Sequence, residues 1–318
     1  MAEVRGRLGT ENAQIRSYRL AFEKDLRGKW RPVRRAELRG AIAESEIVLV
    51  GDFHVHRQSQ KTFLRLLRSF ASSQGKRSIG LECLSSDDDH LVRKYLQLEL
   101  SEEKFLKAVD WANSWTFPWE NYRPIFEWAR ENKVEIFGLN TPRGRRSSLR
   151  SRDRWAARCL VERIRAKQNE KIFVLFGDLH ICQSHLPREL RQMQRNIRIT
   201  RILQNPDQIY FDLLEKGLEH QHDLVCLASG AYCILNVPPW VRWSSYLTFL
   251  ESQTDRDLWS SSNEDSLAID YGDHVLRLAQ LIASDLGVHV DFSRLSVYSA
   301  DEEVFWDEIE RSVGPSDR

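Results

Sequence analysis

The sequence predicts an α/β protein with a mainly parallel sheet that is covered by helices on both faces. Continuous apolar runs of strand length recur along its first three quarters, and segments with a helical spacing of apolar residues separate them. Because parallel strands need long crossover connections, this alternation favours a parallel sheet. A chain of 318 residues has room for one large domain with an appendage or for two modest domains.

The predicted strands are short apolar runs. They cover residues 46–51, 78–82, 134–139, 171–176 and 198–203, followed by 224–228 and 231–235. The predicted helices between them cover 58–70, 90–98, 124–132 and 152–167. The first of these helices places Phe63, Leu67 and Phe70 on one face, as expected for packing on a sheet. The second follows a run of N-capping residues at 85–89.

The alternation of strands and helices stops after the Asn-Val-Pro-Pro-Trp segment at 236–240. Helical patterns follow at 243–250, 274–286 and near 301–310. The sequence therefore predicts three parts: a helical lead-in over residues 1–45, an α/β domain over 46–238 and a helical C-terminal extension over 239–318. An aromatic cluster between 111 and 122 is typical of a core, although such rings also stack on flat ligands.

Composition narrows the class of protein. The formal net charge is +1, so no global field favours nucleic acid or an anionic membrane, and no nucleic-acid partner is expected. The arginine-rich stretch at 143–158 is dense enough to meet a phosphate or carboxylate, or it is a solvated surface. The first 29 residues have no apolar segment typical of a signal peptide, and no run has transmembrane length. Five scattered cysteines without a Cys-x-x-Cys pair suggest reduced thiols, so a cytoplasmic location is expected.

Two copies of one motif follow two of the predicted strands. They read Gly51-Asp52-Phe53-His54 and Gly177-Asp178-Leu179-His180, and further polar residues follow two other strands at Glu82 and at Asn140 with Arg143. In an open parallel sheet, side chains at the carboxyl ends of the strands converge on one crevice. We therefore expect the two motifs to face each other there, with Glu82 between them.

The residue types at this edge support two kinds of chemistry. Two imidazoles and a carboxylate, from His54, His180 and Glu82, can hold a divalent ion such as zinc, manganese or iron. The histidines can instead act as general bases, with Asp52 or Asp178 orienting the ring. Alternatively these residues have no role in binding or catalysis: each histidine is structural, and Glu82 caps the helix that follows.

Neighbouring residues leave further alternatives open. His54-Val55-His56 also fits the His-x-His of amidohydrolase-type metal barrels, which predicts a closed barrel with more strand-end ligands. Asp52-x-His54 occurs in calcineurin-like phosphoesterases, but their Gly-Asn-His signature is missing. His185 is either an extra ligand or a loop residue.

Several segments together resemble the ChaN-like, haem-binding uptake and TIKI superfamily, which includes erythromycin-esterase-like and TraB-like proteins. The resemblance covers about residues 47–238. It rests on the order of Gly-Asp-Phe-His at 51–54, Gly-Leu-Glu at 80–82, Trp-Glu-Asn-Tyr-Arg-Pro-Ile at 119–125, Gly-Leu-Asn-Thr-Pro-Arg at 138–143 and Gly-Asp-Leu-His at 177–180.

The resemblance implies two different functions. The TIKI branch is a metal-dependent protease with two Gly-x-x-His motifs and a glutamate, which correspond here to His54, His180 and Glu82. The ChaN branch binds haem, and the Asn-Thr-Pro-Arg segment is closer to it. This chain departs from the family in having Asp52 where glutamate is usual, and in lacking a lipobox. No motif identifies a haem ligand, and the candidates for cofactor binding are Asn140, Tyr122 and His185, with Tyr210 as another tyrosine.

The first functional expectation is thus a ChaN-like protein that binds haem or a metal ion. The second is a divalent-metal-dependent hydrolase, either a protease or an esterase, in which the ion lowers the pKa of a bound water. In that enzyme Asp52 and Asp178 are catalytic and Arg143 steadies an anionic substrate or transition state. The third is a fold kept for interactions through its tryptophan-rich tail. Expected partners are haem or a small-molecule or peptide substrate, and a homodimer is allowed.

Overall fold

The computed structural model describes residues 13–70, 75–143, 147–167 and 169–259, with short stretches between 279 and 290. Compact packing divides the chain into a first unit, Met1–Asp255, and a second, Arg256–Arg318. The predicted boundary at 238 stays a prediction. The described part of the predicted helix at 274–286 contains helical residues at 279–280, 282–283 and 285, whereas the helix expected near 301–310 lies outside the described residues.

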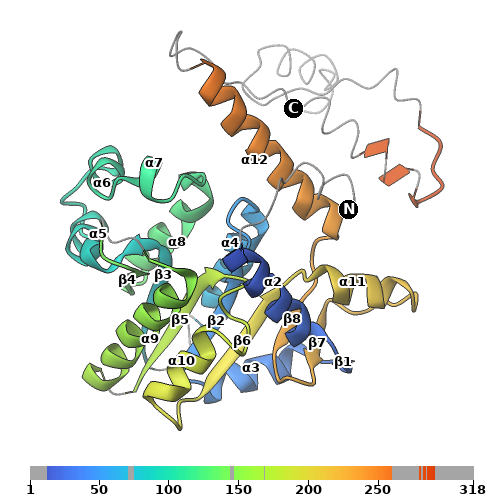
Figure 1. Ribbon diagram of the computed structural model, residues 1–318, viewed down its shortest axis with the longest axis horizontal. Helices are drawn as coiled ribbons and strands as arrows, with labels where there is room; N and C mark the ends of the chain where they lie inside the picture. The colour runs from blue at the N-terminus through green and yellow to red at the C-terminus, as the bar shows by residue number, and fades with distance from the viewer. Residues whose placement is uncertain are drawn as a thin grey trace, which may run out of the picture. The chain divides into compact units, whose positions relative to one another are not determined.

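The first unit contains an eight-stranded sheet in the order β1-β7-β8-β6-β2-β5-β3-β4 (Figure 1). The strands are β1 (Trp30–Pro32), β2 (Ile47–Asp52), β3 (Lys76–Ser85), β4 (Glu135–Asn140), β5 (Glu170–Gly177), β6 (Ile199–Gln204), β7 (Leu224–Leu227) and β8 (Tyr232–Ile234). Only β7 pairs antiparallel, with β1 and with β8; the other pairs are parallel. The predicted α/β class with a mainly parallel sheet is confirmed.

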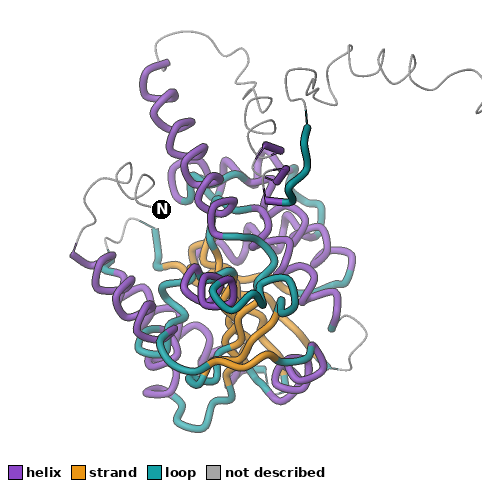
Figure 2. The backbone as a smooth tube through the Cα atoms, turned by 90° about the vertical axis from the view of Figure 1, so that its right-hand side faces the viewer, coloured by secondary structure: helices purple, strands orange, loops and turns teal. Residues whose placement is uncertain are grey.

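Helices cover both faces of the sheet, as Figure 2 shows for the strands at its centre. They are α2 (Ala13–Leu26), α3 (Arg35–Glu44), α4 (Arg57–Ser69), α5 (Asp89–Leu96), α6 (Glu102–Ala108), α7 (Trp111–Ser114), α8 (Trp119–Glu131), α9 (Leu149–Ala166), α10 (Leu186–Met193), α11 (Asp207–Leu214) and α12 (Pro239–Trp259), with a 3₁₀ turn η1 (Ser86–Asp88). Among the described residues, no helix is long and apolar enough to cross a membrane.

Alternation along the central strand explains why the sheet has two cores. Successive side chains of a strand point to opposite faces. Val48 and Val50 of β2 therefore pack with α3, α4 and α8, whereas Ile47 and Leu49 pack with α9, α10 and α11. All four side chains are fully buried. A strand buried on both faces needs the continuous apolar run that the sequence has at 46–51.

Candidate functional site

The carboxyl ends of three neighbouring strands form the candidate site. β5 lies between β2 and β3 and is parallel to both, so the segments that follow these strands meet at one edge. The register places Asp52 opposite Gly177, and the two Gly-Asp-x-His segments therefore leave the sheet side by side. Glu82 of β3 lies between His54 and His180, at 3.9 Å and 3.8 Å from their Nε2 atoms. The structure thus brings together the three residues expected to converge.

The first motif forms an aspartate–histidine pair. His54 Nδ1 donates a hydrogen bond to Asp52 Oδ2 at 2.9 Å. Asp52 also accepts hydrogen bonds from the Tyr122 hydroxyl at 2.7 Å and from the Gln60 amide at 2.5 Å. Because the Nδ1 proton is held by Asp52, Nε2 of the ring is left as a proton acceptor on the side of Glu82.

The second motif is built differently. His180 Nδ1 donates to Asp153 of α9 at 2.5 Å, and Asp153 accepts a second hydrogen bond from the Tyr18 hydroxyl of α2 at 2.6 Å. The expectation that Asp178 could orient this ring is therefore corrected, because Asp153 takes that place. The sequence repeat is not a repeat of function, although both imidazoles present Nε2 to the same carboxylate, that of Glu82.

Glu82 is held by two donors in addition to the imidazoles. One oxygen pairs with the Arg152 guanidinium, and the other accepts the backbone N–H of Gly177 at 2.6 Å. A Cβ atom at Gly177 would lie 3.2 Å from Glu82 Oε2 and 3.4 Å from His54 Nε2, so a larger residue there would crowd both groups. Glu82 is 3% exposed and belongs to the site, and the alternative that it caps a helix is wrong.

The charges around the two acid–base groups shift their pKa values in opposite directions. Burial alone would lower the pKa of His54, but the hydrogen bond and charge of Asp52, with the charge of Glu82, outweigh burial and raise it. Burial alone would raise the pKa of Glu82, but Arg152 and the two imidazoles lower it. Glu82 is thus kept as a carboxylate beside a ring that readily takes up a proton.

His54 is the part of the site that a ligand can reach. Its side chain is 24% exposed, compared with 8% for that of His180. The ring lies edge-on to Trp115, with 4.6 Å between ring centroids, and 4.9 Å from Phe117. Phe117 in turn lies 5.1 Å from Phe249 of α12. Two aromatic side chains therefore lie next to the His54 ring.

Asp178 is buried against the first motif, away from the ring of His180. A Cβ atom at Gly51 would lie 1.9 Å from Asp178 Oδ1, so this contact requires glycine. Nη1 of Arg242, from α12, lies 3.8 Å from Asp178 Oδ2, and neither oxygen of Asp178 accepts a hydrogen bond from the described residues. Burial raises the pKa of Asp178 to about 7, opposed by the charge of Arg242 and helped by that of Asp52.

Asp178→Asn is expected to make the protein more stable at alkaline pH. The folded-state pKa of Asp178 lies above the unfolded value, so wild type loses stability as pH rises from the unfolded pKa to about 7. Asparagine cannot ionise. Its stability gain over wild type should grow by about 2–3 kcal/mol between about pH 5 and pH 8. Urea unfolding at the two pH values checks this, and an equal difference at both would contradict it.

Two residues expected at the site lie elsewhere. Arg143 pairs with Asp88 and donates to the Ala108 carbonyl oxygen, so it does not reach Glu82. Arg152 supplies the site cation in its place. Asn140 ends β4, and its side-chain oxygen accepts the backbone N–H of the next residue, as in a local turn.

The tyrosine and histidines expected to bind a cofactor are also engaged. Tyr122 is at the site, but its buried hydroxyl donates to Asp52, and burial raises its pKa well above the usual range. The His185 ring stacks on Tyr18 at 3.7 Å between centroids. His56 hydrogen-bonds Ser245 of α12 at 3.1 Å instead of joining His54. The sheet order begins at β1 and ends at β4, so the closed-barrel alternative is wrong.

Asp153 and Tyr18 were not predicted from the sequence, and Arg152 was named only as one of the arginines of the stretch 143–158. Arg152 and Asp153 begin the predicted helix at 152–167, and Asp153 is the one acidic residue within the arginine-rich stretch 143–158. An acidic residue that stands alone among arginines could have been singled out from the sequence as a candidate for a specific interaction. Tyr18 carries no local signal, since it meets Asp153 across 135 residues of sequence.

The donor atoms of the site fit a metal ion only in part. Two imidazoles and a carboxylate have suitable chemistry, and an aspartate behind each histidine is common around metals. The two oxygens of Glu82, however, are already bound by Arg152 and by the Gly177 N–H. Within the described part of the chain, no group of three or more His, Cys, Asp or Glu side chains is arranged to hold a metal ion. The Arg152 guanidinium supplies a positive charge beside Glu82.

One known protein family is similar to part of this chain. Its model, described as haem-binding uptake, Tiki superfamily, ChaN, matches residues 38–153. This match confirms the resemblance predicted from the motifs, over a segment that contains His54, Glu82 and Asp153 but ends before His180. No match to a curated protein was found.

Solved structures of several bacterial proteins are similar to part of this chain. One of them is ChaN of Campylobacter jejuni, which is described as binding haem cofacially. It is 14% identical over 55% of this chain and 88% of that chain, with a TM-score of 0.47. RRSP, a MARTX toxin effector domain from Vibrio vulnificus, is 22% identical over 51% and 35% of the two chains, with a TM-score of 0.34. The Pasteurella multocida toxin, whose C-terminal region is described as having a thiol-protease-like catalytic triad, is 14% identical over 55% and 25%, with a TM-score of 0.39.

Proposed function

We propose that the site hydrolyses ester or amide bonds by acid–base catalysis. The proposal concerns a chain that is similar to the ChaN, Tiki-superfamily model over residues 38–153. One observation carries the proposal: two imidazoles, each held at Nδ1 by an aspartate, present their Nε2 atoms to one arginine-paired carboxylate. An aspartate behind a histidine fixes the ring and stabilises its protonated form, which is how general bases are commonly prepared.

His54 is the general base in this scheme, because its Nδ1 is bonded to Asp52, which leaves Nε2 to accept a proton, and its side chain is the more exposed of the two. It takes a proton from the water that attacks the carbonyl carbon. The guanidinium of Arg152, which pairs with Glu82, supplies a positive charge for the oxyanion that forms. In its protonated form His180, on the other side of Glu82, gives its Nε2 proton to the leaving oxygen or nitrogen, and the proton that His54 took from water then replaces it. The aromatic rings around His54 favour a substrate with an apolar group next to the bond that is cleaved.

The proposal is tested with the full chain and a panel of nitrophenyl esters and fluorogenic peptides. His54→Gln is expected to lower kcat/KM by about 100- to 10 000-fold, because the general base is lost. Treatment with a chelator should leave the wild-type rate unchanged, since no step needs an ion. His90→Gln is the matched control, because His90 is exposed and bonds only to the Asp87 carbonyl oxygen among the contacts described. A variant at His54 that is as active as wild type would refute the proposal.

Haem binding is a second candidate, and the family match is the observation that favours it. The residues at the site fit this group in part. His54 Nε2 is an accessible imidazole nitrogen of the kind that ligates haem iron, and Trp115 and Phe117 offer apolar rings beside it. Tyr122 and His185 are less suited, because the Tyr122 hydroxyl is bonded to Asp52 and His185 is stacked on Tyr18. Haem would supply redox or oxygen chemistry when bound.

A haem titration followed by absorbance separates the two candidates. If haem binds through His54, a shifted Soret band should appear with wild type and with His90→Gln, and should be lost in His54→Gln. Bound haem should then also block ester hydrolysis, because both functions use the same nitrogen. A titration without a Soret shift would exclude haem and leave hydrolysis to be decided by the rate measurements.

A further inference from the structure

Helix α2 supplies the last member of a buried chain of hydrogen bonds that ends at the site. The Tyr18 hydroxyl donates to Asp153 Oδ2 at 2.6 Å, and His180 Nδ1 donates to Asp153 Oδ1 at 2.5 Å. Tyr18 is 7% exposed, Asp153 1% and His180 6%. A carboxylate removed from water to this extent needs donors for both of its oxygens, and these two side chains provide them.

We propose that Asp153 and Tyr18 are positioning residues for His180, so that α2 is part of the working site. This inference rests on the proposed function and assigns the orienting group of its second histidine. Asp153 holds the proton on Nδ1 and thereby leaves Nε2 facing Glu82 as the nitrogen that exchanges protons. Tyr18 fixes the orientation of the Asp153 carboxylate through its hydrogen bond to Oδ2.

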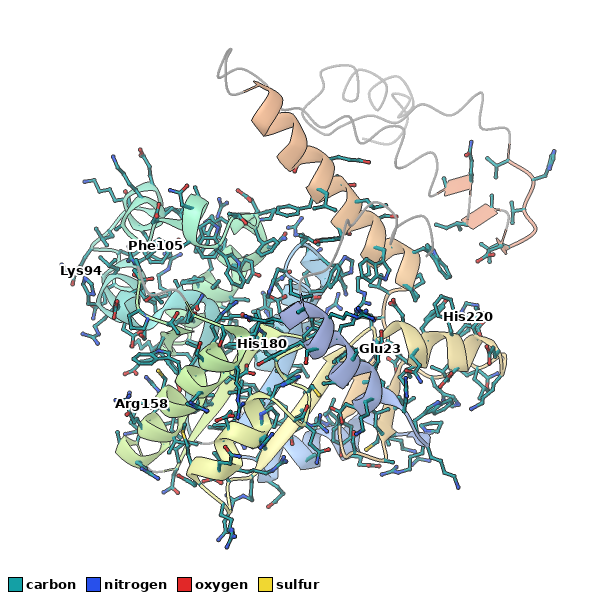
Figure 3. All side chains as sticks on the ribbon, in the orientation of Figure 1. Glu23, Lys94, Phe105, Arg158, His180 and His220 are labelled. Carbon is teal, nitrogen blue, oxygen red and sulfur yellow. The ribbon has the colours of Figure 1, made fainter. Side chains whose placement is uncertain are left out.

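The position of α2 is determined by more than one contact. Asp25, near the end of this helix, pairs with the buried guanidinium of Arg201 and accepts the backbone N–H of Gln183 at 3.0 Å. Tyr18 itself stacks on His185, with an angle of 4° between the ring planes. Residues 183 and 185 belong to the loop that follows His180, so α2 holds the second motif from outside. Figure 3 shows the labelled His180 next to α2, the helix that carries the labelled Glu23.

The contrast with the first motif explains why an outside residue is needed. Asp52 precedes His54 by two residues and bonds to its ring, whereas the equivalent Asp178 faces Gly51 and Arg242. The second imidazole therefore has no orienting acid from its own motif. The family match begins at residue 38, so Tyr18 lies outside the matched segment, while Asp153 is its last residue.

The tautomer of His180 provides a test that does not depend on hydrolysis. In the full chain labelled with ¹⁵N-histidine, wild type should have the proton of neutral His180 on Nδ1. Asp153→Asn should transfer a large share of it to Nε2, and Tyr18→Phe should give a smaller change in the same direction. The hydrolysis rate should fall at least tenfold in Asp153→Asn and severalfold in Tyr18→Phe.

Controls separate positioning from stability. Tyr95→Phe removes another tyrosine that donates to a carboxylate, Glu102, away from the imidazoles, and should leave both the His180 spectrum and the rate unchanged. If Asp153→Asn does not fold, Tyr18→Phe decides alone. Folded variants in which the His180 tautomer stays as in wild type would overturn the inference. If the variants change the His180 tautomer but the wild-type protein does not hydrolyse any substrate of the panel, the positioning role is supported and the proposed function is refuted.

Discussion

Asp52→Asn is expected to lower the rate constant for hydrolysis by about 100- to 10 000-fold while the protein stays folded. Asparagine can present its NH₂ group to Nδ1 of His54, which favours the tautomer with the proton on Nε2. That tautomer cannot accept a proton from water. Loss of the aspartate charge should also lower the pKa of His54, which Asp52 helps to raise in wild type.

The pH dependence of the same variant has a defined sign. His54 must be neutral to act as a base, so the wild-type rate should fall as pH drops through its raised pKa. In Asp52→Asn the remaining activity should fall only at lower pH. Asp88→Asn is the matched control, because Asp88 is a buried acid paired with Arg143 away from the imidazoles. An unchanged rate and pH profile in Asp52→Asn would remove the acid–base role from this pair.

Gly138→Ala is expected to reduce the free energy of unfolding by about 3 kcal/mol. A Cβ atom there would lie 2.1 Å from the Ser85 carbonyl oxygen and 2.8 Å from that of Leu84, both of which are backbone atoms. The pairing of β3 with β4 shifts register between Leu81 and Ser85, and Glu82 lies in this irregular part. A shift of this part of β3 would move Glu82, so the substitution should also reduce the rate of hydrolysis.

Gly40→Ala is the control for that substitution. Gly40 is an exposed residue of α3, and apart from its chain neighbours and the nearby backbone of its own helix no atom lies within 4 Å of an added Cβ. Alanine should stabilise the helix by about 1 kcal/mol, because it has a higher helix propensity than glycine. Urea unfolding of both variants gives the comparison. Equal stability of Gly138→Ala and wild type would mean that β3 and β4 separate without cost.

The sheet and the edge that carries the site could both be predicted from the sequence, because both depend on local patterns. The apolar run at 46–51 marks a strand buried on both faces, and the residue after it is found at the edge where β2, β5 and β3 end together. Glu82 was placed correctly between the two histidines for the same reason: strand order in a parallel sheet brings strand ends together.

The partners of these residues could not be predicted, because they depend on packing between distant segments. Arg152 meets Glu82 across 70 residues and Tyr18 meets Asp153 across 135. The repeated motif was also misleading. It predicted equal roles for Asp52 and Asp178, whereas close contact with Gly51 and Arg242 draws Asp178 away from His180. Identical letters in two loops do not give identical side-chain directions when the surrounding helices differ.

The strand order has a consequence for how the protein folds during synthesis. β2 and β3 are consecutive in the chain, but β5 lies between them in the sheet. The two early strands can reach their final places only after residues 170–177 have emerged, and pairings between distant segments form slowly. A ribosome-bound chain that ends near residue 153 should therefore expose two apolar strand edges. His54 and Glu82 come together only after β5 has been synthesised and has paired with β2 and β3.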